Sequence, residues 1–266
     1  MSEPHRVMSR EMSTADNWQG SAGPALAGLA GVAGAAWIYL ATGAGLGSAM
    51  RGTDMAGGGM MPMAPAWTPG YAVVMLSMWI VMMTAMMLPT STFAVLRVAG
   101  RAGIERAAGF AAGYLAIWAG FGAAAASLQW ALDSAHLLSG AMALQNAALA
   151  GLVTAAVGVY QLTPLKRACL ERCRALDGCL ARVEARRPWG SVGSGLHYGV
   201  SCLGCCAALM GLLFVGGLMS IPWVAAIAVW VLAEKTLPWG GRVARLGGAG
   251  LIAAGAVAFA IALAHA

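Results

Sequence analysis

Charged side chains are scarce in this sequence of 266 residues. Only 10% of the residues are charged, whereas 60% are hydrophobic, and the mean hydropathy is +0.73. This balance excludes an ordinary soluble domain and is typical of a chain that folds in lipid. The sequence also lacks a Walker A loop, a His-Glu-x-x-His zinc helix and a nucleophile elbow. ATP hydrolysis and metalloprotease chemistry are therefore not expected.

What the sequence does contain is a series of apolar stretches. Seven of them are long enough, or nearly so, to cross a hydrocarbon core that takes about 20 helical residues. They lie near residues 24–45, 71–96, 107–132, 140–162, 195–219, 221–237 and 247–264. The 37 glycines favour helices that approach one another closely. We predict an all-α polytopic membrane bundle of about seven helices, with one transmembrane domain over residues 24–264.

The basic residues predict the orientation of this bundle. If the N-terminus is cytoplasmic, Arg51 alone of the 16 Lys and Arg residues lies outside. This distribution follows the positive-inside rule for a multi-pass protein of the bacterial inner membrane. Residues 1–23 are then a flexible cytoplasmic tail without a cleaved signal, residues 46–70 a Met/Gly/Pro-rich extracytoplasmic loop, and residues 164–194 a basic cytoplasmic linker.

The basic linker contains the segment LKRACLERCRALDGCLARVEARR. This segment predicts a short surface helix whose cations meet anionic lipid headgroups. Nucleic acid is not an expected partner, because the segment shows neither aromatic interleaving nor a nucleic-acid-binding motif. The lipid bilayer is the partner that the composition favours.

Methionine is concentrated in the second apolar stretch, in the segment MWIVMMTAMMLPT. At helical spacing Met75, Met78, Met82 and Met86 fall within an arc of about 80°. Taken alone, such a stripe is more often made of flexible side chains that fill gaps in a core, and the alternative is a set of thioether ligands for a soft metal such as Cu(I). Pro89 is expected to leave a backbone carbonyl of this helix without its usual partner.

Cysteine is concentrated in the fifth stretch, in GVSCLGCCAALM. Cys202, Cys205 and Cys206 stand at i, i+3 and i+4, so their thiols project from one side of a helix, and Met210 follows one turn later. Three thiols at this spacing indicate a metal-ligand or redox cluster, although buried cysteines also serve as small hydrophobic residues. The topology places these thiols and the methionines from Met82 to Met87 at a similar depth, in the inner half of the membrane.

Weaker candidates accompany the two motifs. Cys169 and Cys173 stand at i, i+4 in the basic linker, with Cys179 further along, and form a second thiol site unless they are inert cytoplasmic thiols. Glu234 and Lys235 lie in the sixth stretch, where they tune the charge of a metal site or form an interfacial pair. His197 is a possible further ligand. The loop methionines Met55, Met60, Met61 and Met63 suit weak Cu(I) capture or a simple linker.

The order MWIVMMTAMMLPT, YQLTPLKRACLERCR, GVSCLGCCAALMGLLFVGGLM and AEK resembles a bacterial family of predicted metal-binding integral membrane proteins. The resemblance spans roughly residues 71–238 and implies metal binding, without naming the metal or a reaction. The family motifs fall on Met78, Met82, Met83, Met86, Met87, Cys169, Cys173, Cys202, Cys205, Cys206, Met210, Glu234 and Lys235.

Our leading hypothesis is an intramembrane Cys/Met site for a soft metal, most simply Cu(I), in transport, chaperoning or metalloenzyme assembly. A metallochaperone or metalloenzyme is the expected protein partner, and no catalytic residue is assigned. Two alternatives remain open at this point. One is a membrane thiol–disulfide oxidoreductase that uses the CLGCC cysteines, and the other is a non-catalytic structural subunit of the membrane.

Overall fold

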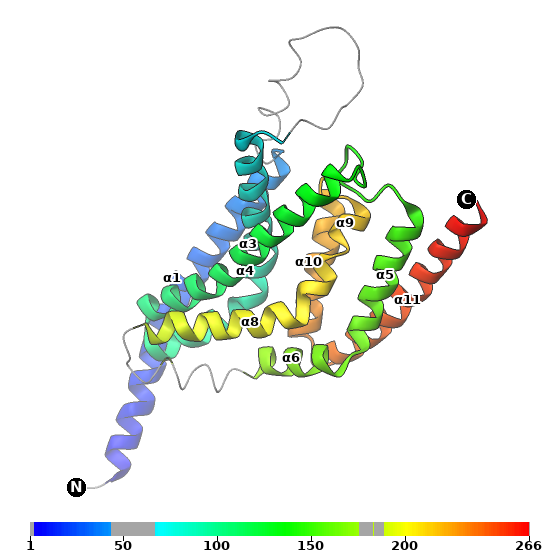
Figure 1. The fold of residues 1–266 in the computed structure, drawn as a ribbon. Coiled ribbons are helices and arrows are strands. Elements are labelled where there is room, and N and C mark those ends of the chain that lie inside the picture. Colours follow the sequence, from blue (N-terminus) through cyan, green and yellow to red (C-terminus); the bar gives the residue numbers. More distant parts are fainter. Residues whose placement is uncertain (1–2, 44–66, 176–182, 184–188, 266) are drawn as a thin grey trace.

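The computed structural model describes residues 3–43, 67–175, 183 and 189–265, and the side chains within these ranges from residue 22 onward. In these ranges the chain is all-α, as predicted, and its β pairing is limited to an isolated bridge between Leu138 and Leu144. The helices are α1 (Glu3–Ala41), α3 (Pro69–Ala102), α4 (Ile104–Ser134), α5 (Ala147–Leu162), α6 (Pro164–Arg174), α8 (Gly190–Met210), α9 (Leu213–Gly216), α10 (Ile221–Thr236) and α11 (Gly240–Ala264) (Figure 1).

The long helices are consistent with a multi-pass membrane protein. Five helices of the described residues are long and apolar enough to cross a membrane, and a sixth span results if the bent pair α5 and α6 counts as one. α5 and α10 have 16 residues each, or about 24 Å at 1.5 Å per residue, which is shorter than a typical hydrocarbon core of about 30 Å. Seven spans and a cytoplasmic N-terminus therefore stay predictions.

Three predicted segments fall wholly or partly outside the described residues. The loop methionines Met55, Met60, Met61 and Met63 are among them, and so is Cys179. Much of the end of the basic linker, after Ala175, is also outside them. α1 already begins at Glu3, so the helix that contains the first predicted span includes most of the segment expected to be a tail.

Threonine side chains set the beginnings of two helices, α3 and α6. The Thr68 side chain accepts a hydrogen bond from the Tyr71 amide and is followed by Pro69, and Thr163 caps α6 at the Lys166 amide in the same way, with Pro164 next. Such caps satisfy first-turn N–H groups, and proline at the first helical position has no N–H to lose. At Thr163–Pro164 the chain bends by 62° from α5 into α6, which turns α6 underneath α8 (Figure 1).

The helices form two groups that α6 and α10 connect. α3 packs against α1 and α4, and α4 packs against α8, while α5 and α11 pair with each other (Figure 1). The α4–α8 crossing is close because Gly195 faces the Phe110 carbonyl, and an added Cβ there would collide with it. Small residues at a crossing permit such approach between membrane helices. This crossing fixes the position of α8 and of its cysteines.

Pro89 has the predicted effect on the carbonyl four residues before it. Because proline cannot donate a hydrogen bond, the Ala85 carbonyl loses its usual helical partner. The indole Nε1 of Trp37 on α1 donates to this carbonyl at 3.1 Å. A buried carbonyl without a partner costs about 1–3 kcal/mol, so this bond holds α1 against the middle of the methionine helix.

Candidate metal centre

Three buried thiols from two helices converge beside α3. Cys173 lies on α6, whereas Cys202 and Cys205 lie on α8, and the three sulfur atoms are all within 4.8 Å of one another. None of the three residues is more than 4% exposed. For metal–thiolate bonds of about 2.3 Å, two sulfurs on one ion lie at most about 4.6 Å apart. The spacing of this trio, which we call the thiol centre, thus fits a shared soft metal ion with little movement.

Two further cysteines border the thiol centre. The sulfur of Cys206 lies 3.2 Å from that of Cys205, although Cys206 is not part of the mutually close trio. Cys169, one turn before Cys173 on α6, lies against α8 at Gly204, where an added Cβ would come within 2.6 Å of the Cys169 sulfur. The two thiol motifs that the sequence analysis treated as separate sites are therefore neighbours in the structure.

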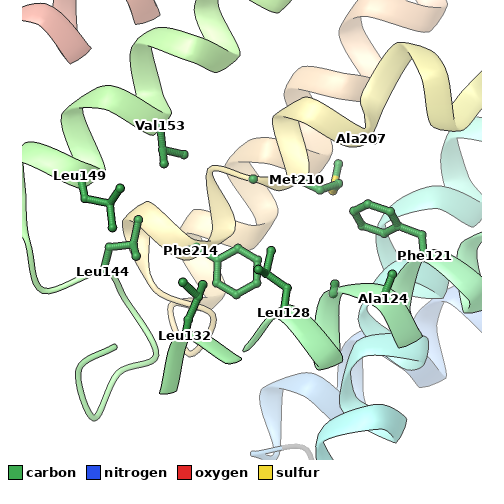
Figure 2. A pocket seen from close by; sticks show the side chains of 12 residues that line it. Phe121, Ala124, Leu128, Leu132, Leu144, Leu149, Val153, Ala207, Met210 and Phe214 are labelled. Atoms are coloured by element: carbon green, nitrogen blue, oxygen red, sulfur yellow. The ribbon is translucent and has the colours of Figure 1, made fainter. Parts of the chain in front are cut away.

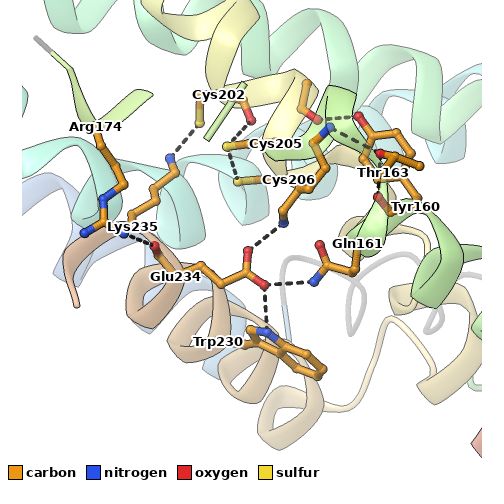
Figure 3. Close-up of polar contacts among 12 residues, drawn as sticks. Tyr160, Gln161, Thr163, Arg174, Cys202, Cys205, Cys206, Trp230, Glu234 and Lys235 are labelled. Atoms are coloured by element: carbon orange, nitrogen blue, oxygen red, sulfur yellow. Dashed lines mark hydrogen bonds and ion pairs between the residues drawn. The ribbon is translucent and has the colours of Figure 1, made fainter. Parts of the chain in front are cut away.

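A buried cation and a hydroxyl group contact the first thiol of the α8 motif. The Lys235 Nζ atom donates to the Cys202 sulfur at 2.7 Å (Figure 3). It also donates to the Thr90 Oγ1 atom at 3.1 Å. The Tyr114 hydroxyl lies 3.2 Å from the same sulfur and donates to the Met87 carbonyl at 3.1 Å. An ammonium group at this distance in a low-dielectric interior stabilises a thiolate over a thiol.

Glu234 belongs to a different cluster from its neighbour Lys235. Its carboxylate forms a buried ion pair with Lys166 at 2.6 Å and also accepts from the Gln161 amide at 2.8 Å and the Trp230 indole at 2.9 Å (Figure 3). Both charged residues of the pair are 1% exposed. This network joins α5, α6 and α10, and it fixes the end of α10 from which Lys235 reaches Cys202.

Aromatic rings enclose the side of the thiol centre that faces α4. Tyr198 on α8 packs between Phe110 and Tyr114 of α4, with ring centroids 5.5 and 5.6 Å apart. All three rings are at most 4% exposed. Such a cover keeps water from this side and strengthens the interactions between charges within the centre.

The predicted thioether ligands are buried but spread over a long stretch of α3. Met78, Met82, Met83, Met86 and Met87 are each at most 3% exposed. Met78 and Met82 line a cavity of about 160 Å³ that Leu40 and Ile221 also border. The contacts of Lys235 and Tyr114 join the thiol centre to α3 at Thr90 and at the Met87 carbonyl. We call this end of α3, the one beside the thiols, its inner end, and the end at Met75 its outer end.

Two other candidates, Met210 and His197, line other surfaces of α8. Met210 lines an apolar groove of about 410 Å³ between α4, α5 and α8, together with Phe121, Leu128 and Phe214 (Figure 2). His197 lies on the exposed face of α8. The groove is closed by aliphatic and aromatic side chains, which suit contact with a lipid chain better than with a metal ion.

Sequence reasoning missed several residues of this region. Lys166 was counted as one more cation of a surface helix, whereas α6 buries Lys166, Leu170 and Cys173, half-buries Cys169 and exposes its other side chains. The spacing of those three residues, i, i+4 and i+7, is that of one helix face and is the signal that could have found them. Tyr114 has no comparable sequence signal, since it is one of several aromatic residues in an apolar helix.

The fold and this centre define a class: helical membrane proteins that hold a buried cluster of soft sulfur donors beside a compensating cation. The chain belongs to the PpoB2 family, which is described as a copper chaperone family and whose model matches residues 76–258. That range contains the thiol centre, Lys235 and every methionine of the α3 stripe except Met75. No curated protein and no solved structure matches the chain. The predicted metal-binding family is thereby confirmed, and copper is the metal that the family description supports.

Proposed function

We propose that the protein is a membrane copper chaperone that holds Cu(I), as cargo, in the thiol centre formed by Cys173, Cys202 and Cys205. The observation that carries this proposal is the mutual approach of three buried sulfurs within 4.8 Å. Thiolates are soft ligands that select Cu(I). The copper chaperone description of the family supports the same metal.

The charges of the centre can balance a monovalent ion. When two of the three sulfurs are thiolates and the third is a neutral thiol, one Cu(I) gives a net charge of −1, which the ammonium group of Lys235 neutralises at 2.7 Å from the Cys202 sulfur. A divalent ion beside Lys235 is neutralised only when all three thiols are deprotonated. Because every charge in a low-dielectric interior is costly, Cu(I) is the ion that this centre compensates with fewer buried charges.

The bordering sulfur groups provide places for copper during transfer. Cys169 lies against α8, and the Cys206 sulfur lies beside that of Cys205. In our proposal both thiols exchange with the ligands of the centre. Weaker thioether ligands along α3 are supplied by Met82, Met83, Met86 and Met87. Met78 and Met210 are further thioether candidates. Weak successive ligands allow an ion to move without release into water.

The proposed membrane arrangement keeps seven spans with a cytoplasmic N-terminus and an inner-membrane location. The distribution of basic residues supports it. In this orientation the thiol centre lies in the inner half of the membrane, next to the basic helix α6. A cytoplasmic metallochaperone as copper donor and a metalloenzyme as acceptor are the partner classes that fit.

The proposal is tested by metal content. Wild-type protein, purified in detergent without chelator and loaded anaerobically with Cu(I), is measured by mass spectrometry beside a Cys173→Ser/Cys202→Ser/Cys205→Ser variant. The wild type should retain about one Cu(I) per chain against a competing chelator, and the variant should lose it, because serine offers no soft ligand. Cys179→Ser is the control and should retain the ion, since it removes a thiol to which the proposal gives no part in holding copper.

Two results would overturn the proposal. The first is equal copper retention by the wild type and the triple variant. The second is a disulfide between any two of these cysteines after rapid thiol trapping in isolated membranes, which would favour the thiol–disulfide oxidoreductase instead.

A further inference from the structure

A buried amide on α4 gathers two thioether sulfurs far from the thiol centre. The Nε2 atom of Gln129 donates to the Met142 sulfur at 3.1 Å and to the Met75 sulfur at 3.5 Å. Its Oε1 atom accepts from the Trp79 indole at 2.7 Å, so the NH₂ group is fixed toward the sulfurs. Gln129 is 2% exposed and Met75 is fully buried. Both sulfurs are thus direct neighbours of one nitrogen atom.

The backbone holds Met142 in an unfavourable conformation at this place. Its φ is 56°, in the left-handed region that side chains with a Cβ rarely adopt. A turn fixes it, because the Met142 amide donates to the Ser139 carbonyl at 2.8 Å and the Leu144 amide donates to the Phe214 carbonyl at 2.8 Å. Strained residues of this kind are concentrated at functional sites. The strain here delivers a thioether to Gln129.

Met75 lies far along α3 from the thiol centre, and buried methionines of the same helix lie between the two sites. Met75 and Thr90 are 15 positions apart, which is about 22 Å along a helix. Between them lie the buried Met78, Met82 and Met86, each about 5–6 Å of helix rise from the next. A row of thioether side chains on α3 therefore extends from the Met75 and Met142 sulfurs toward the thiol centre.

We propose that Met75 and Met142 form a second, weaker site for Cu(I), held ready by Gln129, at the end of α3 opposite the thiol centre. The inference goes beyond the proposed function by assigning a second station for the same cargo. N–H···S bonds are weak, so an ion that takes both sulfur lone pairs displaces them at small cost. Two neutral thioethers bind Cu(I) more weakly than thiolates because they carry no charge. The site is therefore suited to the capture or release of the ion.

The test loads Ag(I), a redox-inert probe for soft monovalent sites, onto four purified full-length proteins in detergent. They are the wild type, Met75→Leu/Met142→Leu, the triple serine variant of the thiol centre, and the combination of the last two. Leucine conserves the volume and apolar character of methionine, so the fold is retained. Met8→Leu/Met12→Leu, two methionines without an assigned role, is the control for binding by other methionines, and circular dichroism checks each variant.

The expected result is two additive losses. The leucine pair should remove a weak equivalent of about one ion and leave the tight one, whereas the triple serine variant should do the reverse. Weak binding that is unchanged by the leucine pair would overturn the second site alone. Tight binding that is unchanged by the serine substitutions would overturn the thiol centre alone, so the two failures are distinguishable.

Discussion

The two ends of α3 face sulfur groups of different chemistry. At the inner end, near Thr90, the neighbours are thiols and the cation of Lys235. At the other end, near Met75, the neighbours are a thioether and the neutral amide of Gln129. Thiolates bind Cu(I) as anions, whereas thioethers bind it only through neutral lone pairs. In our proposal α3 thus connects a site near Thr90 that is suited to holding copper with a site near Met75 that is suited to exchanging it.

The surroundings of the two ends differ in the same sense. The inner end is fixed by a buried ion pair and the hydrogen bonds around Glu234. The outer end is fixed by a short turn with one residue in the left-handed region. A charged network resists rearrangement more than a strained turn does, so we expect the inner site to be the more rigid of the two.

The largest effect is expected for Glu234→Gln, which breaks the charged network of the inner end. The variant leaves the Lys166 ammonium buried without its counterion, and removal of one partner of a buried pair costs about 3–5 kcal/mol. The free energy of unfolding in detergent should fall by this amount, measured by denaturant titration. Exposed Glu171→Gln is the matched control and should change it by less than about 0.5 kcal/mol.

A second substitution separates charge from packing in this network. Replacing both Lys166 and Glu234 with apolar residues of similar volume removes the unpaired charge, so Lys166→Met/Glu234→Leu should recover much of the lost stability. An equally unstable double variant would show that the network acts through its shape rather than through the ion pair.

A smaller effect is expected for Lys235→Gln, which removes the cation from the inner site while the thiols remain. Groups that contact metal ligands without binding the ion affect metal affinity by about 10–100-fold. Retention of Cu(I) against a chelator should fall within that range, whereas Lys235→Arg keeps the charge and should fall less. Equal retention of Cu(I) by Lys235→Gln and Lys235→Arg would contradict the electrostatic role of Lys235.

The smallest effect is expected for Met142→Gly at the outer end. The matched control is Met142→Ala, which removes the same packing and the same thioether but keeps a Cβ. Glycine adopts a positive φ without the steric cost, so the glycine variant should exceed the alanine variant by about 1 kcal/mol in unfolding free energy, while both lose the weak Ag(I) equivalent. Differential scanning measurements with and without Ag(I) check both parts. Equal stability of the two variants would contradict the assignment of strain to Met142.

Much of the fold could be predicted because its signals are local. Apolar runs and caps such as Thr68–Pro69 and Thr163–Pro164 mark helices directly in the sequence. The fourth span was expected from residue 140, but α5 begins at Ala147. The preceding residues form the turn that contains Met142, and its geometry depends on a contact with Phe214, far along the chain.

The site was predictable only in part. The spacing of Cys202 and Cys205 indicates one helix face, but Cys173 joins them through the 62° bend and the packing of α6 on α8, which are tertiary features. Glu234 and Lys235 were treated as a pair, although adjacent helical residues point about 100° apart. The helical period alone predicts that they meet different partners, as they do.

The account's central claim is that one Cu(I) binds sulfur atoms contributed by both α6 and α8. X-ray absorption at the copper edge, on protein loaded with one Cu(I) per chain, tests it most directly when the wild type is compared with Cys173→Ser. We predict a shell of sulfur ligands in the wild type, and one sulfur fewer or lost copper in the variant. Nitrogen or oxygen ligands in the wild type, or an identical sulfur shell in both proteins, would contradict a centre shared by the two helices.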